Sequence, residues 1–342
     1  MRAALLSPDR RWLWPLLASL TLLLVLLSLS SGPLAISTGE SLAAALALIT
    51  GHGEAAVAPE VALVVGSVRL PRTLMAIAVG ALLGQCGAVM QGLFRNPLAD
   101  PGIIGVAAGA ALGAALFLVI WPTAGPLAVP VAAFGGGLAS TALVYAMATR
   151  DGHTSIPTLL LAGVAVSALT GAAIGLLTYI ADDLALRDLS LWQMGSLAGA
   201  QWQQLAVTVP TAVVISWRFQ RAAQALNALL LGEAEARHLG IDVSRLKREL
   251  ILWSALGVGV AVAATGIIGF IGLVVPHLVR MLVGPDHRLL LPLSAAGGAL
   301  MLLAADIGAR TLAAPAEMPV GLVTTLIGVP FFIVLLRRQR HL

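Results

Sequence analysis

Long apolar segments, separated by short breaks rich in charge, glycine or proline, run through the whole chain. Stretches of about 20 residues carry no charge, and an α-helix needs about that length to cross the hydrocarbon core of a bilayer. The pattern therefore predicts about ten membrane helices, of which the sixth and eighth are short. They span residues 12–31, 73–94, 102–120, 127–148, 156–180, 205–217, 250–270, 275–283, 289–309 and 320–336.

The composition agrees with a protein whose solvent is lipid. The 342 residues are 59% hydrophobic and 11% charged, whereas a soluble domain carries about 25% charged residues. We predict an all-α polytopic membrane protein in which residues 1–342 form a single transmembrane domain. The first segment is longer than the apolar part of a signal peptide, so it is interpreted as a membrane helix. The single cysteine, Cys86, is interpreted as a packing residue.

The positive charges fix an orientation. If the N-terminus is cytoplasmic, ten spans return the C-terminus to the cytoplasm, and four of the 20 Lys and Arg residues then lie outside, which leaves 16 inside. The four are Arg69, Arg72, Arg187 and Arg310. The net charge is +4, but the basic residues form no patch with interleaved aromatics, so a nucleic-acid partner is not expected.

Small residues predict how the helices pack. Glycines spaced by four residues let helix backbones approach closely in lipid. They are Gly80 and Gly84 in the second segment, and Gly105, Gly109 and Gly113 in the third. A further run, Gly266, Gly269 and Gly272, precedes Pro276 and predicts a broken helix.

Signatures of catalysis are missing from the sequence. No phosphate-binding GxxxxGK[ST] motif, GxSxG motif or HExxH spacing occurs, so any ATP hydrolysis must come from a partner. The best candidate for an intramembrane acid is Asp306, but it precedes Arg310 by four residues. That spacing favours a local salt bridge. A proton-coupled secondary transporter would need such an acid, and it is kept as an alternative of a different class.

The longest cytoplasmic segment, residues 218–249, carries dense charge together with an apolar face. It predicts two short helices hinged at Gly232, with Gly240 as the stop signal. The apolar residues are Leu229, Leu230, Leu231, Ala234 and Leu239. An amphipathic pair beside a membrane domain suggests docking of a cytoplasmic partner.

The outer arginines oppose the charge bias. Arg69 and Arg72 flank Pro71 at the start of one span, and Arg310 closes another. Snorkelling explains any one of them, but three together suggest a basic docking surface for an acidic partner outside the membrane.

Four motifs in this chain resemble the permease family that imports iron-siderophores, haem and cobalamin. They are RLPR at 69–72, GAVMQGLFRNPLADPG at 87–102, GFIGLVVPH at 269–277 and AADIGAR at 304–310. The resemblance extends from about residue 60 to the C-terminus. It implies a type II ABC importer permease with ten membrane helices, which works as a homodimer in the bacterial inner membrane.

The resemblance also implies partners and site residues. Two ATP-binding subunits would dock on the segment 218–249, and a periplasmic binding protein would dock through glutamates on Arg69, Arg72 and Arg310. The candidate coupling residues are Leu231, Gly232, Glu233, Ala234, Arg237 and Gly240. Asn96 and Leu98 match one element of the cytoplasmic gate. The second element is the loop 153–158, with Thr154 and Ser155 as its candidate residues.

The transported ligand is the least constrained prediction. The stretch 179–199, YIADDLALRDLSLWQMGSLAG, resembles the haem branch of the family more than the cobalamin branch. We therefore expect a haem permease, with a ferric-siderophore or cobalamin permease as the alternative. An intramembrane enzyme is disfavoured, because no nucleophile–base or metal-ligand spacing is present.

Overall fold

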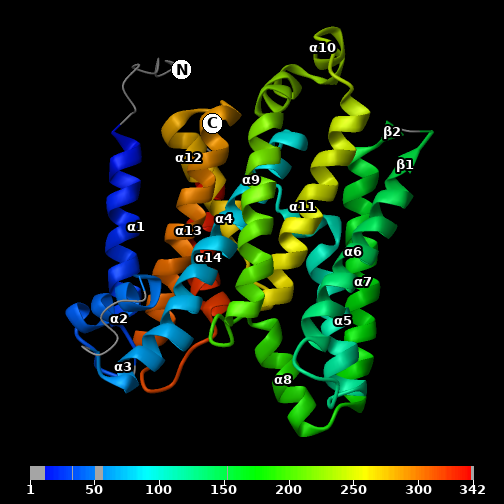
Figure 1. Cartoon of the computed structure of the whole chain (residues 1–342). Coiled ribbons are helices and arrows are strands. Elements are labelled where there is room, and N and C mark those ends of the chain that lie inside the picture. Colours follow the sequence, from blue (N-terminus) through cyan, green and yellow to red (C-terminus); the bar gives the residue numbers. More distant parts are fainter. Residues whose placement is uncertain (1–11, 33, 51–56, 152, 340–342) are drawn as a thin grey trace.

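The computed structural model describes residues 12–32, 34–50, 57–151 and 153–339, and they form a bundle of helices (Figure 1). Two strands of two residues, β1 (Thr149–Arg150) and β2 (His153–Thr154), pair antiparallel. Among the described residues, six helices are long and apolar enough to cross a membrane. They are α1 (Leu13–Ser30), the continuous helix Pro59–Leu93, α6 (Ala128–Ala148), α7 (Ile156–Ile180), α11 (Val243–Thr265) and α13 (His287–Thr311).

The other four predicted segments also lie on helices. These are α5 (Val106–Ile120), α9 (Trp202–Leu231), α12 (Ile271–Val283) and α14 (Val320–Gln339). The predicted all-α polytopic class is thus confirmed. Additional helices stand at the ends of the bundle. In Figure 1, α2 (Thr38–Thr50), α3 (Pro59–Val64) and α8 (Asp183–Gln193) lie at one end, whereas α10 (Glu233–His238), the β1–β2 hairpin and the start of α1 lie at the other.

The second span begins earlier than predicted, because a π-helical turn joins α3 to α4 (Leu70–Leu93). This turn, η2, covers Val65–Arg69, and the N–H of Leu70 bonds to the carbonyl of Val65. Pro71 follows directly; its ring would clash with the carbonyl four residues earlier in a regular α-helix. The wider π turn removes this conflict. It also leaves the carbonyl of Gly66 accepting a hydrogen bond of 3.0 Å from the Trp202 indole N–H.

The sixth span is much longer than the predicted 205–217, since α9 continues through the charged region to Leu231. Two features stabilise the part of α9 that extends beyond the predicted apolar segment. The guanidinium of Arg221 lies 4.2 Å from the ring centroid of Trp217, so the cation is held against an aromatic face. The side chains of Phe219 and Leu226 are fully buried on the opposite side.

Close backbone contact joins α4 to α13, as the glycine spacing predicted for the second segment. A Cβ on Gly80 would lie 2.3 Å from the carbonyl oxygen of Gly298, and one on Gly84 would lie 2.2 Å from that of Ser294. No side chain larger than hydrogen fits at either position. The third segment behaves alike, because a Cβ on Gly113 would lie 2.1 Å from the carbonyl oxygen of Ala132 in α6.

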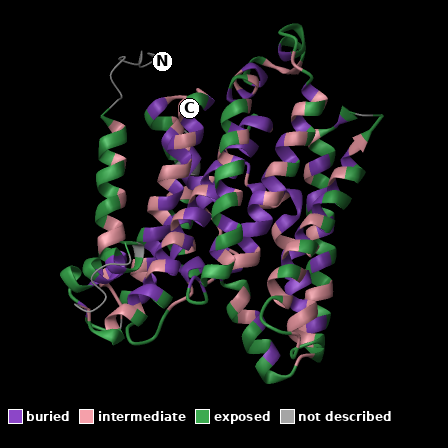
Figure 2. Cartoon of the chain, in the orientation of Figure 1, coloured by how far each residue is buried: buried purple, intermediate pink, exposed green. Residues whose placement is uncertain are grey.

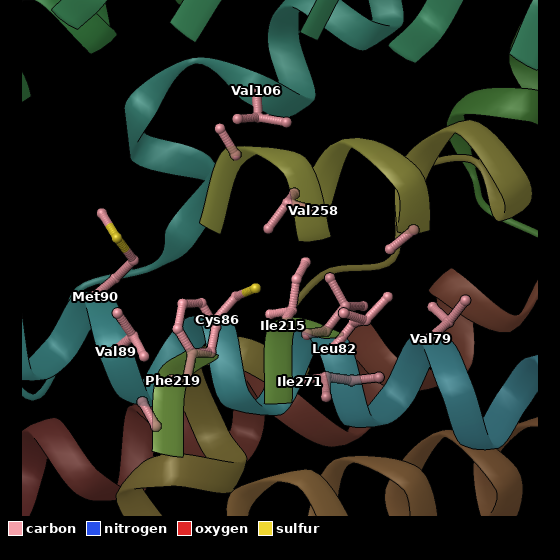
Figure 3. Packing of buried hydrophobic residues seen from close by; sticks show 14 of the residues in the cluster. Val79, Leu82, Cys86, Val89, Met90, Val106, Ile215, Phe219, Val258 and Ile271 are labelled. Carbon is pink, nitrogen blue, oxygen red and sulfur yellow. The ribbon is translucent and has the colours of Figure 1, made fainter. Parts of the chain in front are cut away.

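Buried side chains fill the centre of the bundle, and exposed ones face outward (Figure 2). Cys86 lies in this core between α4, α9 and α11, beside Ile215, Phe219 and Val258 (Figure 3). It is a free, fully buried thiol, which agrees with its interpretation as a packing residue. By contrast, α1 exposes leucines along much of its length, as expected of a helix that faces lipid (Figure 2).

The predicted broken helix lies between α11 and α12. Gly266 and Phe270 have φ values of 71° and 68°, and the five residues 266–270 leave the helical path. The chain itself covers the freed backbone: the N–H of Ser196 donates a 2.7 Å hydrogen bond to the carbonyl of Thr265. Pro276 lies inside α12 and is not the point of the break.

Candidate functional site

The segment between α9 and α11 projects from the bundle as the short helix α10 (Figure 1). α9 ends at Leu231, and Gly232 then adopts φ 124° and ψ 156°, a conformation restricted almost entirely to glycine. Gly240 follows α10 with φ 83°, so the predicted hinge and stop are both present. The prediction of a short first helix is wrong, because residues 218–231 form the end of α9.

The surface around α10 is partly apolar. Leu231 and Leu239 are 69% and 64% exposed, and Leu230 and Ala234 are also exposed. Leu229 does not belong to this surface, because its side chain is buried in the core of the chain. The exposed leucines beside charged residues form a surface of the kind that a partner protein covers.

Ion pairs hold the base of α10. Glu233, the first residue of the helix, lies with Oε1 2.6 Å from Nζ of Lys247 and with Oε2 3.7 Å from a guanidinium nitrogen of Arg237. Nζ of Lys247 donates a second hydrogen bond, of 3.2 Å, to the carbonyl of Thr154. A buried ammonium therefore joins α10 to one of the candidate gate residues.

The first candidate gate element is a tight turn after α4. Oδ1 of Asn96 accepts a 2.9 Å hydrogen bond from the N–H of Leu98, across the intervening Pro97. Arg95 has φ 48°, and its Nη1 lies 4.0 Å from the position that a Cβ on Gly232 would take. The turn thus adjoins the hinge at the start of α10.

The second candidate gate element consists of the hairpin and the start of α7. Thr154 is buried, with Oγ1 3.0 Å from Oγ1 of Thr149 in the paired strand. Ser155 caps α7, because its hydroxyl oxygen accepts a hydrogen bond from the N–H of Thr158. Across the part of the chain that the structure describes, no hydrogen bond joins Asn96 or Leu98 to Thr154 or Ser155.

The three outer arginines lie together at the opposite end of the bundle, but each residue is only 3% exposed. The guanidinium of Arg69 donates to the carbonyls of Leu29 and Leu34. That of Arg310 donates to the carbonyls of Ser28 and Ser31 at 3.1 Å. The arginines thus fasten the end of α1 and the chain that follows it to the neighbouring helices.

Asp306 is the centre of this arginine cluster. The predicted pair with Arg310 is present, at 3.1 Å between Asp306 Oδ2 and Arg310 Nη2. Sequence spacing missed the second partner, Arg72, whose Nε donates to Asp306 Oδ1 at 2.9 Å. Arg72 also pairs with Glu317 at 2.8 Å, and the carboxylate of Glu317 is 34% exposed. Glu317 is thus the part of the cluster that solvent reaches.

A polar contact that the sequence gave no sign of joins α9 to the start of α13. The amide of Asn227 donates to Asp286 at 2.7 Å and accepts from the backbone N–H of His287 at 2.8 Å. Hydrogen bonds from Arg288 hold the pKa of the Asp286 carboxyl well below its usual value. No sequence motif links positions that lie about 60 residues apart, so only the fold brings them together.

The structure is a bundle of apolar helices from one end of which α10 projects. Residues 20–338 match the FecCD transport family, and the chain belongs to it. It is an ABC permease, and this family implies ATP-binding subunits and a substrate-binding protein as partners.

Curated relatives carry different ligands. The chain is 50% identical to the hemin transport system permease protein HmuU of Yersinia pestis, over 80% of this chain and 83% of that protein. It is 47% identical to the cobalamin import system permease protein BtuC of Halobacterium salinarum, over 82% of this chain and 75% of that protein. It is 40% identical to the vitamin B12 import system permease protein BtuC of Klebsiella pneumoniae, over 97% of this chain and 95% of that protein.

A solved structure gives the same fold. An inward-facing conformation of a metal-chelate type ABC transporter superposes with a TM-score of 0.84 at 34% identity, covering 96% of this chain and 99% of that one. The predicted type II importer permease fold is therefore confirmed.

Proposed function

We propose that this chain is the permease of an ATP-driven importer that carries haem across the inner membrane. The observation that supports this ligand most directly is the 50% identity to the hemin permease of Yersinia pestis. The stretch 179–199, which resembles the haem branch, includes α8 at the outer end of the bundle. The cobalamin permeases among the relatives make cobalamin the second candidate ligand.

In this proposal two copies of the chain enclose the pathway, and an ATP-binding subunit docks on α10 of each copy. Leu231, Gly232, Glu233, Ala234, Arg237 and Gly240 form the coupling surface. Binding of ATP closes the partner subunits, and α10 transmits that closure to the membrane helices as a rigid-body motion. Helices that pack through glycine can slide without opening large voids. The permease makes and breaks no covalent bond in the ligand.

The gate toward the cytoplasm is assigned to Asn96, Leu98, Thr154 and Ser155. Support comes from their positions at the same end of the helix bundle as α10. Arg95 lies beside Gly232, and the carbonyl of Thr154 accepts a hydrogen bond from Lys247. We assign both termini to the cytoplasm, an orientation that the positive-inside rule supports because it leaves 16 of the 20 Lys and Arg residues inside.

The binding protein is proposed to dock at the opposite end, over Arg69, Arg72 and Arg310. Because these side chains are buried and already bonded, an incoming glutamate would have to compete with Asp306 or Glu317 at Arg72 and Arg310. At Arg69 it would have to compete with two backbone carbonyls. Glu317 is the exposed member, so exchange at Arg72 requires the least rearrangement. Asp306 forms ion pairs with both Arg72 and Arg310, so a structural role accounts for this acid without a proton-carrying function.

A competition experiment tests the ligand. Proteoliposomes containing the permease, its ATP-binding subunits and its binding protein would be loaded with ATP and given labelled haem. Excess unlabelled haem should abolish uptake, whereas excess cobalamin or a ferric siderophore should not. Uptake of labelled cobalamin that haem fails to inhibit would overturn the assignment and favour the second candidate.

A further inference from the structure

Lys247 is a buried cation that the mechanism above does not yet use. Its side chain lies in the first turns of α11 and the residue is only 6% exposed. Lysine is almost never buried without a partner, because removing an ammonium from water is costly. The partners of Lys247 therefore determine why it is there.

The two acceptors of the Lys247 ammonium belong to different structural elements. One is the carboxylate of Glu233, at 2.6 Å, which begins α10. The other is the backbone carbonyl of Thr154, at 3.2 Å, which ends β2. These acceptors lie 14 and 93 residues from Lys247 in the sequence. One side chain thus spans from the coupling segment to the candidate gate.

A shift of Thr154 would reach α7 directly. Thr154 is paired with Thr149 across the hairpin, and the next residue, Ser155, caps the N-terminus of α7. No flexible segment separates the carbonyl held by Lys247 from the first turn of this helix. On the other side, Glu233 directly follows the Gly232 hinge, so any rotation of α10 moves its carboxylate.

We propose that Lys247 is the positioning residue that transmits movement of α10 to the gate at the start of α7. The proposal rests on the assignment of α10 as the ATPase-coupling helix. A charge-assisted hydrogen bond of 2.6 Å is short and strong, so the ammonium follows the carboxylate rather than slipping past it. The second hydrogen bond then moves the carbonyl of Thr154 with it.

The variants are chosen so that the chain still folds. Lys247→Met keeps the apolar stem and removes the charge, and Glu233 retains Arg237 as a partner. Glu233→Met breaks the same link from the other side, at a carboxylate that is 32% exposed. The matched control is Arg245→Met on the same helix, because Arg245 is exposed and pairs only with Glu249 among the described residues.

Two measurements are made on each assembled complex. The first is the amount of haem imported per ATP hydrolysed. The second is the rate at which maleimide labels His153→Cys in β2, with and without ATP, since His153 is exposed and the one native thiol, Cys86, is buried. Co-purification of the ATP-binding subunits is measured for each variant. Lys247→Met should retain them, because Lys247 is buried and lies outside the proposed coupling surface.

Lys247→Met and Glu233→Met should each lower the haem imported per ATP about tenfold, a typical size for a coupling between two sites. Both should also abolish the ATP-dependent change in labelling at position 153, whereas Arg245→Met should behave like the wild type. A wild-type ratio together with wild-type labelling in both variants would overturn the proposal. If the wild-type complex imports no haem, the proposed ligand fails, but the labelling change still tests Lys247 because it needs only ATP.

Discussion

Replacing Arg310 by glutamate tests whether the outer arginines hold the chain together. The substitution would place a second carboxylate beside Asp306, where Nη2 of Arg310 now lies 3.1 Å from Oδ2. It would also remove the donors to the carbonyls of Ser28 and Ser31, which fasten α13 to the end of α1. Both changes occur in a site where the arginine is 3% exposed and the aspartate is fully buried.

The expected loss of stability is large. Removing one partner of a buried ion pair costs about 3–5 kcal/mol, because the other charge stays buried and uncompensated. Here Arg72 still partners Asp306, which reduces the loss, whereas the new carboxylate adds repulsion. Since the two terms oppose each other, we expect a loss within that range of about 3–5 kcal/mol.

The assay is thermal denaturation of the purified permease in detergent, without any partner, together with its yield from membranes. Arg187→Glu is the matched control, because Arg187 also lies at the outer end but is exposed on α8. The Arg310→Glu variant should melt at a clearly lower temperature than the control. If it is as stable as the wild type yet no longer binds the binding protein, then Arg310 points outward and the buried arrangement is wrong.

Two further predictions concern glycines. Gly232→Val should cost about 1–3 kcal/mol, because φ 124° is strained for valine, although the nearest atom to the added Cβ lies 4.0 Å away. The chain should still fold but lose co-purifying ATP-binding subunits, whereas the control Gly199→Val, at a position with open space, should retain them. Normal retention in Gly232→Val would count against α10 as the coupling helix. Gly87→Ala should destabilise the permease by about 3 kcal/mol, since its Cβ would lie 1.9 Å from the carbonyl oxygen of Gly272, whereas Gly171→Ala in α7 should not. Equal melting temperatures for these two alanine variants would show that α4 and α12 are not in backbone contact.

Hydrophobic patterning was sufficient to predict the class of fold, because a bilayer imposes one length and one polarity on every span. It was least accurate where side chains other than the apolar ones extend a helix. The cation–π contact of Arg221 with Trp217 helps α9 to extend beyond the apolar window. The π turn before Pro71 joins α4 to α3, so the continuous helix begins at Pro59. Neither effect has a signature in hydropathy.

The candidate site shows the same division. The hinge at Gly232 and the stop at Gly240 were predictable, since positive φ selects glycine at such positions. The pair of Asp306 with Arg310 was predictable from helical spacing. The second partner of Asp306, Arg72, lies 234 residues away in the sequence and could not be predicted in this way. Lys247 was missed for a similar reason: its carbonyl acceptor on Thr154 is backbone and leaves no trace in the sequence.

The most direct test of the proposed function is haem accumulation in proteoliposomes that contain the permease, its ATP-binding subunits and its binding protein. Vesicles loaded with ATP should accumulate haem, and vesicles loaded with a non-hydrolysable analogue should not. Accumulation that is equal with and without ATP hydrolysis would contradict an ATP-driven importer. ATP hydrolysis without any haem entering the vesicles would contradict haem as the ligand.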